Sequence, residues 1–124
     1  MARNTDRARC IELALPTVKG SNSRTHWVVR HRGAAIDRAY ACAAAQRNAP
    51  SSEAMDAVAL RIDWYCPTKR RIDCDNALSR CKSYIDGLTL AGWWADDSVI
   101  RSVTIAVHLP GERRGVVVIT ATPE

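Results

Sequence analysis

The sequence lacks several features that mark special classes of protein. No apolar run approaches the roughly 20 residues that cross a bilayer, and residues 1–7 lack the apolar core of a signal peptide. It contains no Walker A loop, nucleophile elbow or glycine-rich dinucleotide loop. We therefore expect a cytoplasmic protein with no membrane partner and no organic cofactor.

The chain also has no Phe, and aromatic residues make up only 6% of it, so Ala, Val, Ile and Leu must supply the core. A chain of 124 residues with a hydrophobic fraction of 47% suits one folded domain, expected to span residues 1–124. Trp93 and Trp94 are interpreted as part of its core, the alternative being that they stack on bases.

The five cysteines show no metal-binding or redox pattern. Their number is odd, and no pair has the C-x-x-C spacing of zinc sites. Free cysteines in a reducing cytosol mostly behave as small buried hydrophobic residues. We expect this for all five, which are Cys10, Cys42, Cys66, Cys74 and Cys81.

Positive charge is in excess. The net charge of +5 and a pI near 9.2 permit a polyanionic partner without requiring one. Basic residues gather at residues 24–32 and 69–71, and acidic residues at 73–75 and 96–97. A solvated surface explains any one of these groups, so their arrangement carries the information.

Four segments have clear secondary-structure patterns. Apolar and polar residues alternate over residues 10–15 and 57–66, which predicts two strands. Helical spacing over residues 34–48 and 75–91 predicts two helices, the second ended by Gly92.

The remaining segments complete the expected topology. Residues 17–32 are polar and are expected to form a loop. Two β-branched runs, residues 98–109 and 116–122, flank a Pro-Gly turn and are expected to pair as an antiparallel hairpin. The expected fold is α/β (α+β), a mixed sheet of about four strands with two helices packed on it, in the order β-α-β-α-β-β.

A run of cations leads directly into two carboxylates at residues 69–76, KRRIDCDN. It lies where a strand, a loop and the start of a helix are expected to meet. An Asp at a helix start commonly caps free backbone N–H groups and suits the helix dipole. Capping explains one of Asp73 and Asp75 but hardly both, so the pair is a candidate metal site.

The helix that follows has a polar face. Asp75, Ser79, Lys82 and Asp86 are spaced by four, three and four residues, so they share one side of the helix. The Lys82 ammonium is therefore expected to point along the side that the helix start presents, where it could meet a phosphate or a water. The alternative is a solvated ion pair with Asp86.

Two further acids, Asp96 and Asp97, precede the third predicted strand and are ordinary turn residues when taken alone. We expect the chain that returns to the sheet to bring Asp97 close to Asp73 and Asp75. Three converging carboxylates repel one another unless a cation lies among them. A few hard oxygen ligands suit Mg²⁺ or Mn²⁺ better than zinc.

Carboxylates among arginines do not suit a surface that only holds nucleic acid, because each carboxylate repels phosphate. A divalent ion that bridges carboxylate and phosphate resolves this conflict. Metal-assisted phosphodiester hydrolysis uses such a mixture, because the metal lowers the pKa of an attacking water and a nearby cation offsets developing charge.

Together these residues resemble the RusA family of Holliday junction resolvases, common in phages and prophages. The specific part of the resemblance lies within residues 70–98, and a weaker part covers residues 15–32 and the following helix. The matching motifs are Arg70-Arg71-Ile72-Asp73-Cys74-Asp75-Asn76, Lys82, Asp86-Gly87-Leu88, Ala91-Gly92 and Asp96-Asp97-Ser98.

The resemblance implies roles for individual residues. Asp73, Asp75 and Asp97 correspond to the catalytic acids and metal ligands, with Asp96 beside them as a further ligand, and Lys82 corresponds to the catalytic lysine. The residues expected to bind DNA are Lys69, Arg70, Arg71, Asn76, Asn22, Arg24, Arg30 and Arg32.

The chain departs from the family pattern at two places. Three extra residues, close to one helical turn, separate Asn76 from Lys82. Ser79 occupies the position that the family lysine would have without these three residues. Ile72 replaces a basic residue of the family pattern just before the first Asp, so Arg70 or Arg71 would have to take the role of that basic residue.

The protein implied by the resemblance is an Mg²⁺-dependent homodimer, with Mn²⁺ as a substitute, that nicks two opposing strands of a four-way DNA junction in a bacterial cell. A two-fold substrate needs two equal sites, and one chain holds one. Two alternatives stay open: a non-catalytic nucleic-acid-binding module with the same fold, and a metal-dependent enzyme that acts on RNA or nucleotides.

Overall fold

Strands and helices alternate along most of the chain before two strands end it. The computed structural model describes residues 7–17, 27–48 and 53–124. One small α+β domain results, in the predicted order β-α-β-α-β-β. Its elements are β1 (Arg9–Ala14), α1 (Trp27–Asn48), β2 (Val58–Tyr65), α2 (Cys74–Leu90), β3 (Ile100–His108) and β4 (Val116–Pro123), with a short 3-10 turn (Asp97–Val99) before β3.

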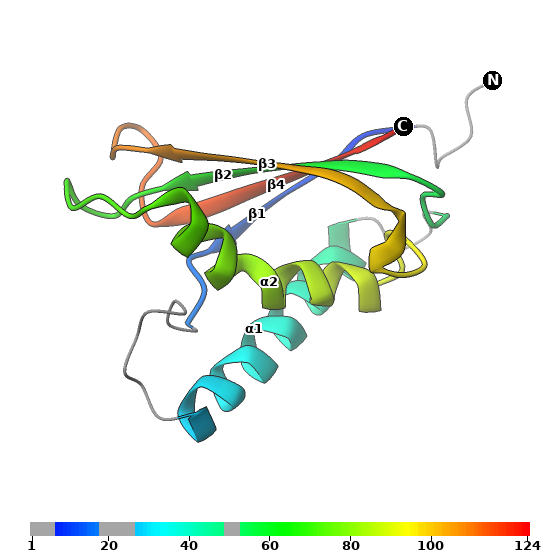
Figure 1. Cartoon of the computed structure of the whole chain (residues 1–124), viewed down its shortest axis with the longest axis horizontal. Coiled ribbons are helices and arrows are strands. Elements are labelled where there is room, and N and C mark those ends of the chain that lie inside the picture. The colour runs from blue at the N-terminus through cyan, green and yellow to red at the C-terminus, as the bar shows by residue number, and fades with distance from the viewer. Residues whose placement is uncertain (1–6, 18–26, 49–52) are drawn as a thin grey trace.

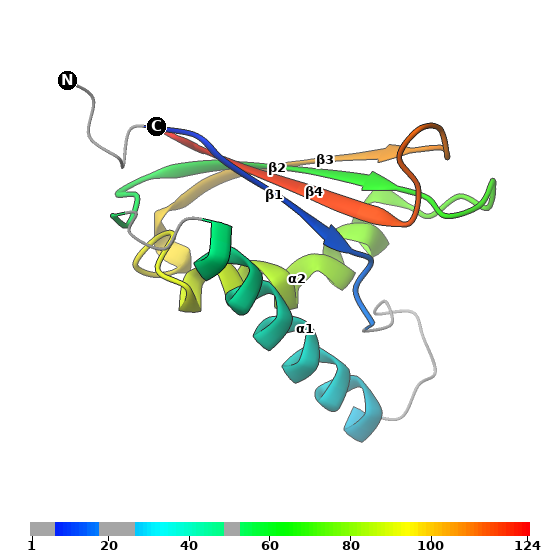
Figure 2. The same cartoon turned by 180° about the vertical axis from the view of Figure 1, so that it is seen from behind.

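The four strands form one mixed sheet in the order β1-β4-β2-β3. β4 pairs antiparallel with both β1 and β2, and β3 pairs parallel with β2. Both helices cover the same face of the sheet and leave the other face open (Figures 1 and 2). Parallel strands need a long crossover, which α2 provides between β2 and β3.

The predicted hairpin between the last two strands is wrong, because β2 separates β3 from β4. Burial explains the arrangement. β4 has the nearly continuous apolar run of a central strand, whereas most of β3 is exposed or partly exposed, as suits an edge. The buried residues of β4 are Val117, Val118, Ile119 and Ala121.

The core lies between the sheet and the helices and follows the predicted alternation. Every second residue of β2, from Val58 to Trp64, is buried. Trp93 and Trp94 are also buried, at 1% and 0% exposure, which confirms their interpretation as core residues and excludes base stacking by them. Neither α1 nor α2 has the length and apolarity that crossing a membrane requires.

Helix α1 begins at Trp27, seven residues before the predicted start at residue 34, so the prediction of a loop over residues 17–32 is wrong for its last six residues. The sequence was misleading because Gly33 and the polar residues before it weaken the helical pattern. A single glycine costs a helix only about 1 kcal/mol, which does not end it.

The prediction that all cysteines are buried is confirmed for Cys66 and Cys81 but wrong for two others. Cys10 is exposed because it alternates with the buried Arg9 and Ile11 along β1. Cys74 is exposed as the first residue of α2. The fifth, Cys42, is partly buried.

Helices α1 and α2 touch backbone to backbone at Gly87. A Cβ atom added there would lie 2.5 Å from the Arg38 carbonyl oxygen and 2.8 Å from the Ala41 Cβ. No side chain fits between the helices at this point, so Gly87 sets how closely α2 approaches α1.

Gly87→Ala is expected to lower the free energy of unfolding by about 1–3 kcal/mol, because the helices must separate to relieve the clash. The helix-propensity gain of alanine is about 1 kcal/mol and does not compensate for a backbone clash. Urea denaturation measures the change. Gly111→Ala is the matched control, since nothing lies within 4 Å of its added Cβ; equal stability of the two variants would contradict the close approach.

Candidate functional site

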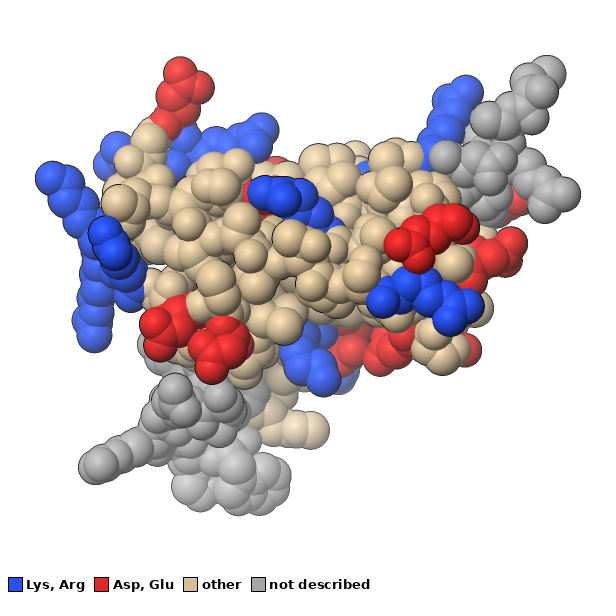
Figure 3. All heavy atoms as spheres, turned by 45° about the horizontal axis from the view of Figure 1, so that its top comes forward, with Lys and Arg blue, Asp and Glu red and all other residues tan. Residues whose placement is uncertain are grey.

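A basic loop joins the end of β2 to the start of α2. Lys69, Arg70 and Arg71 are all exposed in it. The Cys66 N–H donates to the His108 carbonyl at 2.9 Å, which fixes the start of the loop at the ends of two strands. Figure 3 shows Lys and Arg side chains gathered at this end of the molecule, with acidic side chains beside them.

The two carboxylates that follow are both at the surface. Asp73 occupies the position before the first residue of α2, yet its side chain makes no capping hydrogen bond. Asp75 lies in the first turn, where the helix dipole favours a negative charge. Side-chain capping therefore does not explain Asp73, and neither carboxylate has a hydrogen-bond partner among the described residues.

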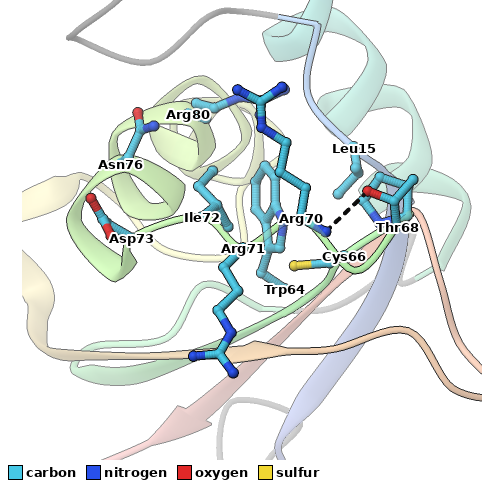
Figure 4. Close-up of a pocket in the computed structure, with 11 residues that line it drawn as sticks. Leu15, Trp64, Cys66, Thr68, Arg70, Arg71, Ile72, Asp73, Asn76 and Arg80 are labelled. Carbon is cyan, nitrogen blue, oxygen red and sulfur yellow. Dashed lines mark hydrogen bonds between the residues drawn. The ribbon is translucent and has the colours of Figure 1, made fainter.

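A hollow of about 540 Å³ lies beside Asp73 (Figure 4). Arg80, which was not predicted from the sequence, lines this hollow. The Arg80 guanidinium lies 4.9 Å from the centre of the Trp64 ring and donates to the Pro16 carbonyl at 3.0 Å. A signal was available, because Arg80 follows Asn76 by one helical turn and so shares its side of the helix.

Asn76 also lines this hollow. Its side-chain oxygen is buried and accepts no hydrogen bond from the described residues. Arg70 and Arg71 extend in opposite directions from the loop, so they border different sides of the site (Figure 4). The start of α2 thus combines two carboxylates and a buried amide with three neighbouring cations, Arg70, Arg71 and Arg80.

Lys82 is exposed at the middle of α2. It follows Asp75 by seven residues, which is about 10 Å along a helix axis. The polar face predicted for α2 exists, since Ser79 and Asp86 are only partly buried. Lys82 nevertheless lies two turns away from the acids at the start of its own helix.

Asp96 and Asp97 lie at the opposite end of α2. The Thr89 hydroxyl donates to Asp97 Oδ1 at 3.2 Å. Asp96 Oδ1 accepts from the Ser98 N–H at 2.7 Å and from the Ser98 hydroxyl. These hydrogen bonds, the one from the hydroxyl first, lower the pKa of Asp96. Both acids border a second hollow, of about 370 Å³, together with Asp86.

The predicted convergence of Asp97 on Asp73 and Asp75 is wrong within one chain. Asp73 precedes α2 and Asp97 contacts its last turn, and a helix of 17 residues is about 25 Å long (Figure 1). Among the described residues, no group of three or more His, Cys, Asp or Glu side chains is placed to hold a metal ion. One chain alone therefore does not provide the expected three-carboxylate site.

The other residues expected to bind DNA lie in the N-terminal half. Asn22 and Arg24 are outside the described residues. Arg30 belongs to α1, with its side chain outside the description, and Arg32 is exposed on the same helix. Among the described residues predicted to bind DNA, Lys69, Arg70, Arg71 and Asn76 lie together near the start of α2.

Comparison with known proteins gives one family finding. A family model described as endodeoxyribonuclease RusA matches residues 16–120, most of the chain. The matched region contains both ends of α2, the basic loop and all of β2 and β3. No curated protein matches the chain.

The cysteines provide a test of this surface. The thiolate is the reactive form of cysteine, and burial raises the pKa of Cys81 to about 12. At pH 8 we expect a thiol reagent to label Cys10 and Cys74 in the native protein, and Cys66 and Cys81 only after unfolding. Peptide mass spectrometry locates the label. Labelling of native Cys81 as fast as Cys74 would contradict the placement of α2.

Proposed function

The chain belongs to the RusA endodeoxyribonuclease family, and from this membership we propose that it is a metal-dependent nuclease that resolves four-way (Holliday) DNA junctions by paired, symmetric nicks. The family match over residues 16–120 carries the proposal. The expected setting is DNA recombination and repair in a bacterial cell or its phage.

The charges at the start of α2 support this activity. Three exposed cations, Lys69, Arg70 and Arg71, adjoin the carboxylates of Asp73 and Asp75. The cations attract phosphate, whereas the carboxylates repel it. A divalent ion bound between a carboxylate and a phosphate would remove this repulsion. Mg²⁺, or Mn²⁺ in its place, would polarise the phosphodiester and lower the pKa of an attacking water.

The expected metal site has three carboxylates, and the start of α2 supplies only two of them, Asp73 and Asp75. A two-fold homodimer can supply it, because an isologous interface brings residue i of each chain to residue j of the other. We propose that Asp73 and Asp75 of one chain act with Asp97 and Asp96 of the partner subunit. Such a dimer has two identical sites, one for each opposing strand of a junction.

The remaining residues receive roles consistent with their places. Lys69, Arg70 and Arg71 would hold backbone phosphates, and Asn76, whose buried oxygen lacks a donor, would position the site. Lys82 would orient water or offset negative charge in the transition state. DNA would also be bound by Asn22, Arg24, Arg30 and Arg32.

Mixing two inactive variants tests the shared site. Asp75→Asn and Asp97→Asn should each lower junction cleavage by roughly 100-fold or more, because each removes a metal-ligand charge at nearly constant size. In a heterodimer of the two, one site contains both substitutions and the other contains neither. We therefore expect the mixture, exchanged and assayed in Mg²⁺, to regain nicking of a four-way junction.

The matched control is a mixture of Asp73→Asn with Asp75→Asn, which leaves every site with one damaged acid and should stay inactive. If the wild type cuts but the first mixture stays as inactive as its components, the sharing between chains is wrong. A wild type that binds junctions without cutting in Mg²⁺ or Mn²⁺ would support the binding module. Preference for RNA or nucleotides would support the third alternative.

A further inference from the structure

A third hollow, of about 500 Å³, lies on the open face of the sheet, at the end where β2 and β3 finish. Tyr65 faces this side because Trp64, its neighbour in β2, is buried toward the helices. The Tyr65 ring stacks on the ring of His108, its register partner in β3, at 4.6 Å between centres. The residues that line the hollow are Tyr65, His108, Leu109, Gly111, Glu112 and Arg113.

His108 is held in place by a charged pair on the same face of the sheet. His108 Nε2 lies 2.7 Å from Asp63 Oδ1, and Arg61 donates to both oxygens of Asp63 at 3.1 Å. Burial opposes ionisation of Asp63, but the hydrogen bonds from His108 and Arg61 outweigh burial and lower the pKa of this carboxyl. The negative charge of Asp63 is therefore already offset by Arg61, and the His108 ring is fixed beside the hollow.

Arg113 brings a positive charge to the hollow. Its guanidinium carbon lies 5.6 Å from the centre of the Tyr65 ring, and its Nε lies 3.4 Å from Glu12 Oε1. The ring contact holds the guanidinium in place, while 55% of the Arg113 side chain stays exposed. Exposed ion pairs are weak, so Glu12 does not prevent a phosphate from binding Arg113. Arg113 is thus a positioned and accessible partner for an anion.

The two loops at this end of the sheet have a large excess of positive charge. Residues 67–72 and 109–115 contain one acid, Glu112, and five cations, which are Lys69, Arg70, Arg71, Arg113 and Arg114. The loops start side by side, because the Cys66 N–H donates to the His108 carbonyl at 2.9 Å. Lys and Arg side chains gather at this end of the molecule (Figure 3). The basic surface near the start of α2 therefore extends to the third hollow.

We propose that the third hollow binds a backbone phosphate of a DNA arm outside the cut site, with Arg113 as its main partner. The inference rests on the proposed function, because it takes a four-way junction as the bound DNA. A polyanion suits this surface better than a single phosphate, since it can contact the cations of both loops at once. Leu109, which is 51% exposed, provides an apolar side on which the adjoining sugar can pack.

The length of the basic loop limits how far this contact lies from the cut. Asp73 follows Cys66 by seven residues, and seven residues span at most about 25 Å. Along one DNA strand, successive phosphates are about 3.4 Å apart in the direction of the helix axis. We therefore expect the bound phosphate to lie within about seven nucleotides of the cut.

Removal of the Arg113 charge tests the contact. Arg113→Ala should weaken junction binding roughly 10-fold at low salt, because it removes a charged partner of a phosphate. The slope of log K against log salt should become smaller by about 1. Both effects should be equal for junctions of different sequence, since phosphate contacts do not read bases. Titration of a fluorescent junction in EDTA, where no metal-dependent cleavage proceeds, measures them.

The matched control is Arg47→Ala, which also removes one exposed cation but from the last turn of α1, on the covered side of the sheet. It should change neither the affinity nor the salt slope. Glu112→Gln provides a variant of opposite sign, because it removes the one acid of the two loops and should tighten binding.

Neutral phosphates locate the partner of Arg113. Methylphosphonates, placed singly within about seven nucleotides of the cut, should weaken binding by the wild type wherever a cation contacts the phosphate. At the position held by the hollow, the same replacement should not weaken Arg113→Ala further, because that contact is already lost. Arg47→Ala should respond as the wild type does at every position.

The outcomes separate this inference from the proposed function. Equal affinities and salt slopes for Arg113→Ala and Arg47→Ala would overturn the inference alone, as would a wild-type response of Arg113→Ala to every methylphosphonate. If Arg113→Ala lost only the binding of inorganic phosphate or a free nucleotide, the hollow would be a small-anion site and the inference would fail. A wild type that binds junctions but never cuts them would reject the proposed function, while the binding data would still decide the role of the hollow.

Discussion

The length of α2 is the constraint on which the arrangement of the acids depends. Because β2 and β3 are parallel, both strands begin at the same end of the sheet, and the chain must return along the full sheet between them. α2 provides this return, so the residues before it and after it are held apart by its length. Asp73 and Asp97 cannot meet in one chain without breaking the crossover.

This separation has an electrostatic advantage for folding. Converging carboxylates raise one another's pKa and oppose folding when no cation is bound. In this chain Asp73 and Asp75 lie beside a basic loop, and Asp96 accepts hydrogen bonds from Ser98, so each group is accommodated separately. In the proposed dimer the groups would meet only on assembly, and metal binding and association would then stabilise each other.

Local patterns in the sequence identified the elements and part of the site. Alternation located β2, Gly92 in a left-handed conformation ends α2 as predicted, and the KRRIDCDN run correctly indicated a surface of mixed charge. Strand partners and the distance from Asp73 to Asp97 were not predictable in this way. They depend on which strand is buried in the middle of the sheet, and periodicity within one segment contains no information about the neighbour of that segment.

The mistaken hairpin is informative for the same reason. Residues 98–109 have a strong strand pattern, and the nearest strand in sequence, residues 116–122, was the expected partner. In the fold, β4 is the more buried of the two strands and lies between β1 and β2, and β3 is left with one neighbour. Within β3, residues 102–107 carry no charge, and an uncharged edge segment of this kind is prone to pair with other chains.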